Sequence, residues 1–303
     1  MVKKYLAHRI SLVQALTWIV ASTVLVAGLG HHGVKAYFKW QHSRLRDSEY
    51  HITSLVQTGP QKEALKCNFL AELIGLSADR PVSSLRFNLE AAQQRLLRSP
   101  LLREAHVKLL GTQTLFVDYT VRQPVAMVYD FENVAIDQEG YLFPFSPFFS
   151  PKNLPQIYLG SAPFGKQGHE PDRAIARWGE PYQDRYMTLA MDLLRLVKAA
   201  ELDDLFTVHR IAVSNAFSAS CGTREIILMV RDEVVKKEGS IFFPRILRLS
   251  TKNYAQELAN FLRLRQSLLD KEMDGLSQPS VAVQPVKVID FRLPQLAFIE
   301  ETK

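Results

Sequence analysis

The uncharged stretch of twenty residues from Ile10 to Leu29 constrains the fold of this chain more than any other feature. An α-helix rises about 1.5 Å per residue, so this stretch would reach roughly 30 Å, the thickness of a bilayer's hydrocarbon core. Its polar residues are uncharged, and the hydroxyls of Thr17 and Ser22 can bond to the helix's own backbone. The sequence therefore predicts one transmembrane helix, with about 270 residues following it on one side.

A cleaved signal peptide is the alternative interpretation of this segment. Lys3, Lys4 and Arg9 form a basic leader, and residues 26–28 (VAG) fit a small-residue cleavage site. The apolar run exceeds the roughly 7–15 residues of a signal core, which favours an uncleaved anchor. Lysines and arginines stand on both sides of the run, so the positive-inside rule does not discriminate between orientations. We expect residues 1–9 to be a short cytoplasmic tail and the bulk of the chain to be extracytoplasmic or periplasmic.

The positive charge of the chain is concentrated beside the apolar run. Residues 1–50 hold seven Lys/Arg and two Asp/Glu (+5), and residues 51–303 hold the remaining thirty and twenty-nine (+1). Nucleic-acid binding needs a basic stripe on a folded domain, and this distribution provides none. Anionic headgroups attract basic segments next to a membrane, so the expected partner of this charge is lipid.

The sequence offers no catalytic or metal-binding pattern. Cys67 and Cys221 lack metal-ligand spacing, and the apolar neighbours of Cys67 predict a buried thiol. Histidines crowd into residues 31–51 without carboxylates or cysteines at ligand spacing, which favours solvated or headgroup-facing imidazoles. The motifs of zinc proteases, serine hydrolases and P-loop proteins do not occur. We expect no enzymatic activity, cofactor, metal or small-molecule substrate.

One segment matches a dinucleotide-binding fingerprint. Residues 28–33 (GLGHHG) form a literal G-x-G-x-x-G after an apolar segment, and Asp47 follows about 20 residues on. The apolar run is far too long for a first Rossmann strand, Asp47 stands in a polar stretch, and no βαβ series follows. A Rossmann-type NAD-binding enzyme is therefore kept only as a remote alternative.

Residues 30–122 divide into a linker and a small domain. Residues 30–49 are a basic and aromatic juxtamembrane linker, in which Tyr37, Phe38 and Trp40 are placed as an interfacial belt. The hydrophobic periodicity of residues 50–122 predicts a β-α-α-β-β domain with two helices on one face of a sheet. Its expected elements are strand 50–58, helix 61–76, helix 89–98 with Asn88 as N-cap, and strands 105–110 and 114–122.

Residues 123–299 predict a larger α+β domain on a mostly antiparallel sheet, followed by a tail at 300–303. Residues 144–185 are rich in Pro, Gly and polar residues and are interpreted as a loop or insertion. The expected strands are 125–129, 134–136, 141–143, 208–213, 225–230, 240–249, 286–292 and 296–299, and the expected helices are 186–200 and 254–269.

Four short patterns recur in an order that resembles one protein family. They are Arg122-Gln123-Pro124-Val125-Ala126, residues 135–143 (AIDQEGYLF), residues 153–155 (NLP) with Gly160, and residues 288–292 (VIDFR). They resemble the landmarks of the FtsQ/DivIB family of bacterial cell-division proteins, over residues 10 to 299. The resemblance implies one transmembrane helix, a POTRA domain and a β-domain, joined at Arg122, Pro124 and Ala126. Val121, residues 161–185 and residues 236–244 depart from the family pattern.

The resemblance implies a non-enzymatic scaffold in the inner (cytoplasmic) membrane at the division septum. Its implied partners are two bitopic proteins, FtsB/DivIC-like and FtsL-like, of which one pairs an extended segment with the edge strand at the end of the β-domain. On this chain that edge is Leu296, Ala297, Phe298 and Ile299. An ordinary terminal strand that completes the core is the structural alternative for these residues. A POTRA-type envelope translocation protein, and a secreted adhesion or anchoring protein, are the alternative functions.

Overall fold

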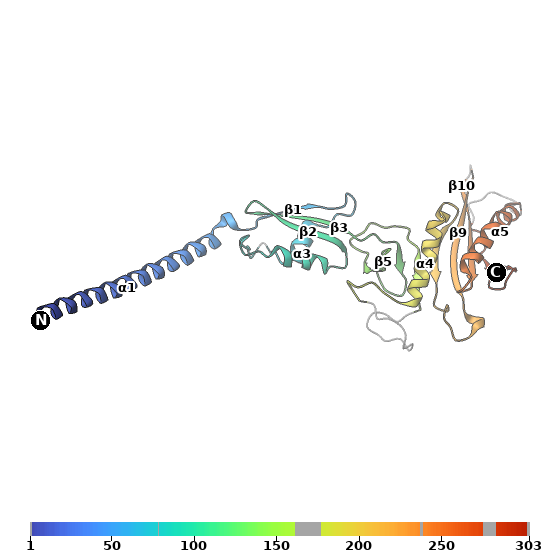
Figure 1. Ribbon diagram of the computed structural model, residues 1–303. Helices are drawn as coiled ribbons and strands as arrows, with labels where there is room; N and C mark the ends of the chain where they lie inside the picture. Colours follow the sequence, from blue (N-terminus) through green and yellow to red (C-terminus); the bar gives the residue numbers. More distant parts are fainter. Residues whose placement is uncertain (1, 78, 161–176, 237–238, 275–282, 302–303) are drawn as a thin grey trace. The chain divides into compact units, whose positions relative to one another are not determined.

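The computed structural model describes residues 2–77, 79–160, 177–236, 239–274 and 283–301 (Figure 1). The chain folds as two compact units, which are described separately below. The first comprises Met1–Thr58, Lys66–Leu96 and Ala105–Asp118, and the second comprises Gly59–Leu65, Leu97–Glu104 and Tyr119–Lys303.

The first element is a single long helix, α1 (Val2–Arg46). It includes the predicted transmembrane segment and does not end there, because it also contains most of the residues predicted as a linker. The described part, Gln14–Arg44, is long and apolar enough to cross a membrane, and every side chain in it is exposed. The hydroxyls of Thr17 and Thr23 donate to the carbonyl oxygens of Gln14 and Ile19, at 2.8 and 2.7 Å.

The helical course of α1 contradicts a dinucleotide-binding turn at residues 28–33. These residues lie inside the helix, whereas the Rossmann fingerprint requires a strand that turns into a helix. Asp47 has a local role, since its side chain accepts from the backbone N–H of Glu49 and caps the short 3₁₀ helix η1 (Ser48–Tyr50).

The first sheet has three strands in the order β1-β3-β2. Its elements, in chain order, are β1 (Ser54–Thr58), α2 (Cys67–Ile74), α3 (Leu89–Leu97), β2 (Leu102–Leu110) and β3 (Thr114–Val121). Strand β1 is parallel to β3, with Leu55 beside Leu115. Leu115 and Val117 are fully buried and alternate with less buried residues, so one face of β3 carries the core. The predicted β-α-α-β-β order is confirmed.

Local backbone chemistry explains the limits of the two helices in this region. The side chain of Asn88 accepts from the N–H of Ala91 at 2.9 Å, as its prediction as an N-cap requires. Helix α2 ends at Gly75, which adopts a left-handed conformation with φ of 81°. It begins six residues later than predicted, at Cys67, and that residue is exposed on the surface. The prediction of a buried thiol at Cys67 is therefore wrong, because only Leu70 and Ile74 are buried in this helix.

The second sheet has nine strands in the order β12-β11-β10-β9-β8-β7-β4-β5-β6. The strands are β4 (Ala126–Val128), β5 (Val134–Ile136), β6 (Leu142–Pro144), β7 (Gln156–Tyr158), β8 (Thr207–Ala212), β9 (Ile226–Lys236), β10 (Gly239–Leu249), β11 (Lys287–Asp290) and β12 (Phe298–Glu301). Three neighbouring pairs are parallel, namely β4 with β7, β7 with β8 and β10 with β11. The sheet is thus mixed, although antiparallel pairs predominate.

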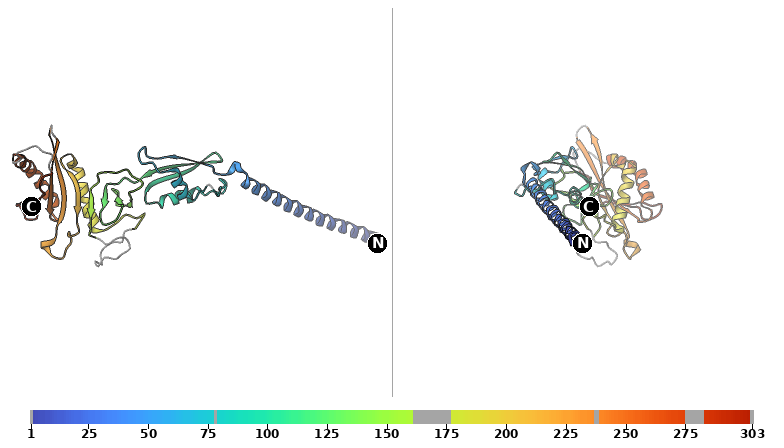
Figure 2. Two further views of the ribbon diagram at one scale, coloured as in Figure 1. Left: turned by 180° about the vertical axis from the view of Figure 1, so that it is seen from behind. Right: turned by 60° about the vertical axis from the view of Figure 1, so that its left-hand side comes forward.

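Helices α4 (Arg185–Ala199) and α5 (Tyr254–Asp274) pack on this sheet and share one hydrophobic core with it (Figure 2). The core includes Leu193 of α4, Phe261 of α5 and the inward residues of β8, β9 and β10. Asp184 caps α4 by accepting from the N–H of Tyr186 at 2.8 Å. Two further 3₁₀ helices are η2 (Leu202–Asp204) and η3 (Cys221–Thr223).

The region predicted as a loop, residues 144–185, contains strand β7. This strand has only three residues, and its partners β4 and β8 are distant in the sequence, so local periodicity gave no signal. Residues 161–176, which include most of the family-divergent segment, lie outside the described residues.

Candidate functional site: an open sheet edge and its groove

The last described strand, β12, forms one edge of the nine-stranded sheet. It pairs only with β11, antiparallel, with Ile299 beside Ile289 and Phe298 beside Asp290. The opposite side of an edge strand presents backbone N–H and C=O groups to solvent, which is a template for pairing with another chain. The predicted edge at the end of the domain is thus present, although its strand is displaced along the sequence.

The four residues predicted to form this edge fall into two groups. Phe298 and Ile299 lie in β12 and are 57% and 47% exposed. Leu296 and Ala297 precede the strand, in a turn where the Leu296 N–H donates to the carbonyl of Leu293. This displacement follows from the turn, in which Gln295 adopts a left-handed backbone with φ of 62°.

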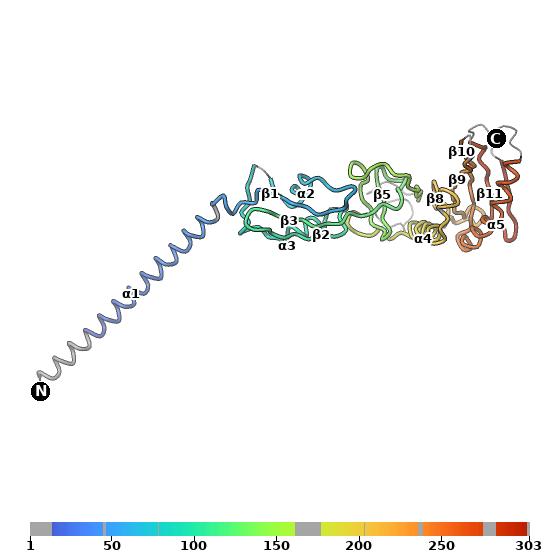
Figure 3. The backbone as a smooth tube through the Cα atoms, turned by 90° about the horizontal axis from the view of Figure 1, so that it is seen from above, coloured from blue at the N-terminus to red at the C-terminus, as the bar shows by residue number. Residues whose placement is uncertain are grey.

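A groove lies between α5 and the turn that joins β11 to β12. Figure 3 labels α5 and β11, the two elements that flank it, in the C-terminal part of the chain. Its volume is about 610 Å³. Its lining is formed by Asn253, Gln256, Glu257, Asn260, Arg263 and Leu264 of the α5 region and by residues 291–297 of the turn. Among the described residues, the exposed Arg263 makes no ion pair, so a cation is free at the groove. The lining thus combines apolar side chains with the charge of Arg263.

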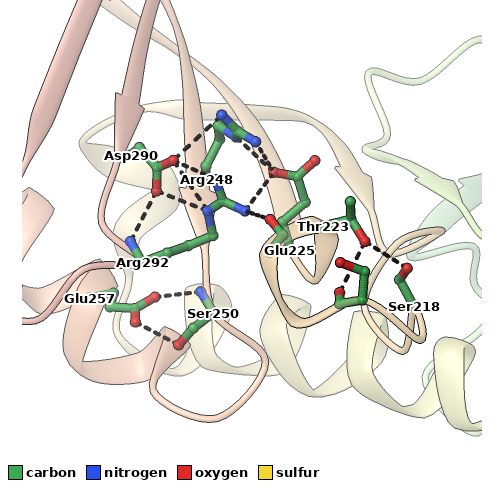
Figure 4. Close-up of polar contacts among 10 residues, drawn as sticks. Ser218, Thr223, Glu225, Arg248, Ser250, Glu257, Asp290 and Arg292 are labelled. Atoms are coloured by element: carbon green, nitrogen blue, oxygen red, sulfur yellow. Dashed lines mark hydrogen bonds and ion pairs between the residues drawn. The ribbon is translucent and has the colours of Figure 1, made fainter.

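A polar network supports β11 and the start of the turn (Figure 4). Arg292 contacts Asp290 at 2.7 Å, and Arg248 contacts Glu225 at 2.6 Å and Asp290 at 3.4 Å. Burial alone would raise the pKa of Asp290, but the hydrogen bonds from Arg292 and the charges of Arg292 and Arg248 outweigh it, so this pKa is lowered. The hydrogen bond to Asp290 is the main reason that the pKa of Arg292 is raised. The network holds the turn in one conformation beside the groove.

A second ionic cluster connects β12 to the interior of the domain. Lys287 of β11 contacts Glu301 of β12 at 2.8 Å and Glu272 of α5 at 3.1 Å. Burial alone would lower the pKa of Lys287, but hydrogen bonds to both glutamates outweigh it and raise this pKa. Glu272 in turn contacts the fully buried Arg245 at 2.9 Å, and Arg245 contacts the fully buried Asp232 at 2.9 Å. The edge strand is therefore tied to α5 and β9 through side-chain charges.

This buried cluster was not predicted, although the sequence contains a signal for it. Arg245 occupies an inward position of β10, in the alternating series Ile241, Phe243, Arg245, Leu247 and Leu249. A charge at an inward position of a strand needs a partner, because an unpaired buried charge is costly. The pattern could have indicated a buried ion pair, but not which carboxylate forms it.

The structure brings together two of the four family-like patterns, the predicted domain junction and residues 135–143. Arg122 lies 2.7 Å from the Asp137 carboxylate and stacks over the ring of Tyr141 at 3.7 Å. The same carboxylate accepts the backbone N–H groups of Glu139 and Tyr141 at 2.9 and 2.8 Å. Arg122 and Asp137 are buried within the second unit, as are the other two junction residues, Pro124 and Ala126. Their arrangement is that of a buried structural brace.

Within the described ranges, no group of three or more His, Cys, Asp or Glu side chains is arranged to hold a metal ion. Comparison of the chain with protein-family models and with curated proteins produced no match.

Proposed function

We propose that this protein is a membrane-anchored, non-enzymatic scaffold that binds an extended segment of another protein by strand addition at β12. The observation that carries the proposal is the open edge of the nine-stranded sheet, where Phe298 and Ile299 leave about half of their surface in solvent. An added strand would pair with the free backbone groups and cover both side chains.

The apolar surface at this edge can contribute measurably to binding a partner. An aromatic side chain buries about 200 Å², so the 57% exposed fraction of Phe298 leaves roughly 110 Å² to cover. At about 25 cal/mol per Å², covering it contributes up to roughly 3 kcal/mol to binding, and Ile299 adds somewhat less. These gains offset part of the entropy lost on association, and the backbone hydrogen bonds of the added strand supply a further contribution.

Strand β12 combines a short, charged end, which is typical of a protected edge, with an exposed apolar start. Native edges are commonly blocked by charge, proline or short length, and β12 carries Glu300 and Glu301 at its far end. The two apolar residues at its start are exposed and lie next to the groove beside α5. A partner segment that pairs with Phe298 and Ile299 can continue toward the groove and place an acidic group near Arg263.

The resemblance to FtsQ/DivIB extends the proposal to partners and location. The partners would be FtsB/DivIC-like and FtsL-like bitopic proteins at the division septum, with α1 crossing the inner membrane, residues 1–9 cytoplasmic and the folded units outside. Anchoring both partners in one membrane raises their effective concentration, so a short strand contact can suffice.

The proposal is tested by photo-crosslinking at the edge. A photoreactive residue placed at Ile299 of the full chain, in its native cells, should capture one membrane protein whose cross-linked peptide is extended. The same probe at Val235, which is 75% exposed on β9 and away from the edge, should not capture it. The double variant Phe298→Thr/Ile299→Thr should abolish capture, whereas Val235→Thr should not. Threonine keeps strand propensity and avoids placing a carboxylate beside Asp290.

Two results would contradict the proposal. Equal capture at Ile299 and Val235 would show that the edge has no special role. Unchanged capture by the double threonine variant, with unchanged thermal unfolding, would show that the apolar pair is not the contact. A fluorescent fusion provides an independent test of location, because uniform peripheral signal in dividing cells would remove the septal role but not the strand contact.

A further inference from the structure

Two lysines and two histidines follow one face of α1 beyond its apolar run. His31, Lys35, Lys39 and His42 are exposed and are separated by four, four and three residues. An α-helix turns about 100° per residue, so these four side chains lie within an arc of about 80°. We propose that this stripe, through the charges of Lys35 and Lys39, binds the headgroups of anionic phospholipids. The inference rests on the proposed membrane anchoring by α1.

The depth of the stripe fits the headgroup layer. With a rise of about 1.5 Å per residue, Lys35 and Lys39 lie roughly 9 and 15 Å beyond Leu29, where the apolar run ends. The headgroup layer extends about 5–8 Å beyond the hydrocarbon core on each side. Side chains of a helix tilt toward its N-terminus, which for these residues is toward the bilayer, and lysine stems are long and flexible. Both ammonium groups can therefore reach lipid phosphates.

Few carboxylates lie near these charges, although Asp47 lines one pocket with Lys39 and His42. No carboxylate occurs in residues 1–46, and the first two acidic residues are Asp47 and Glu49. Among the described side chains, Lys35 and Lys39 form neither an ion pair nor a hydrogen bond. Arg44 differs from them, because its guanidinium stacks over the ring of Trp40 at 4.3 Å. The lysines are thus unneutralised cations beside a surface whose charge is opposite.

Tyr37 and Trp40 occupy the opposite flank of the same helical turns, whereas Phe38 lies beside the stripe. Tyr37 and Trp40 are exposed, with ring centroids 6.4 Å apart. On a helix they lie at least about 100° away from Lys35 and Lys39. Tyrosine and tryptophan prefer the membrane–water interface, so one flank favours the interface itself and the other favours its anionic lipids. The continuity of α1 through residues 28–33 fixes the depth of both flanks, because one helix axis runs from the apolar run to Lys39 and Trp40.

The experiment measures lipid preference around the full chain. The protein is reconstituted in phosphatidylcholine vesicles that contain a minor fraction of phosphatidylglycerol and a trace of dansyl-labelled lipid of either class. Energy transfer from the tryptophans to the label reports which lipid surrounds the helix. The wild-type chain should favour labelled phosphatidylglycerol, and Lys35→Gln/Lys39→Gln should lower that preference, by up to about 5-fold per lysine at low salt. Salt of about 1 M, where the screening length is about 3 Å, should remove the preference of the wild type.

A matched control removes equal charge elsewhere. Lys198 and Lys252 are exposed lysines of the second unit, and Lys198→Gln/Lys252→Gln should leave the lipid preference unchanged. A preference that persists in Lys35→Gln/Lys39→Gln, or that falls equally in the control, would overturn the inference. A wild-type chain that floats with pure phosphatidylcholine vesicles but shows no preference would overturn the lipid site alone. A chain that does not float with them would overturn the anchor and the inference together.

Discussion

The buried contact between Arg122 and Asp137 supports a quantitative prediction about stability. The side chains of these two residues are only 10% and 7% exposed, and the Asp137 carboxylate accepts Arg122 and two backbone N–H groups. Asp137→Ala removes all three bonds and leaves the guanidinium of Arg122 buried over Tyr141. Glu139 also reaches Arg122, at 3.5 Å, but its side chain is 44% exposed.

The magnitude follows from these contacts. Removing one partner of a buried ion pair typically costs about 3–5 kcal/mol of unfolding free energy, because the other charge stays buried and uncompensated. Glu139 can compensate part of the charge, so we expect a loss near the lower end, about 3 kcal/mol. Asp137→Asn retains an oxygen for the two backbone N–H groups and should cost about half as much. Glu139→Gln should cost less than about 1 kcal/mol, because its pair is partly solvated.

The assay is urea unfolding of the full chain in detergent micelles, followed by near-ultraviolet circular dichroism. The expected order of destabilisation is Asp137→Ala, then Asp137→Asn, then Glu139→Gln. The double variant Arg122→Met/Asp137→Ala should recover part of the loss, because no buried charge then remains unpaired. A loss for Asp137→Ala no larger than that for Glu139→Gln would refute the assignment of Arg122 and Asp137 as a buried brace.

Three further perturbations test other parts of the structure. Gly160→Ala should lower the free energy of unfolding by about 2 kcal/mol or more, because φ is +67° and the new Cβ would stand 2.7 Å from the Cβ of Ser214. Gly111→Ala has a similar φ of +69° but open space around the new Cβ, so it should cost only about 1 kcal/mol. Urea unfolding measures both losses. Lys287→Met removes the ion pair to Glu301 at the sheet edge, so it should accelerate amide hydrogen exchange in β12 with little change in the free energy of global unfolding. Unchanged exchange in β12 would contradict a stabilising role for the pair between Lys287 and Glu301. The pKa of Asp290 is lower in the folded state, so its stabilisation is present above the unfolded value of about 3.9 and is lost as pH falls through the folded value. Asp290→Asn should therefore reduce the acid sensitivity of the melting temperature below about pH 4, and an identical pH profile would count against the network in Figure 4.

Elements with a strong local signal were predicted well. The uncharged run from residue 10 onward is helical, Asn88 caps α3, and β5 has the predicted bounds of Val134–Ile136. In each case, residues that are adjacent in the sequence or one helical turn apart are enough to specify the element and its limits. The start of α2 was wrong, since residues 61–66 have helical composition but Lys66 adopts an extended backbone as the N-cap.

The candidate site was predicted only in part. The last strand was expected at residues 296–299, and Phe298 and Ile299 belong to it, but the turn around Gln295 moves its start by two residues. The groove beside α5 was not predicted. Its two walls are separated by some thirty residues in the sequence, and only tertiary packing places them together.

The sequence by itself determined the long apolar helix, the two α+β regions and the concentration of positive charge beside the apolar run. These are consequences of composition and short-range periodicity, which act within a few residues. Tertiary structure alone decided that β7 joins β4 to β8, that Arg245 meets Asp232 inside the domain, and that β12 is left as an open edge. Strand order and buried charge pairing depend on which distant segments share a core, and periodicity within one segment contains no information about its partner.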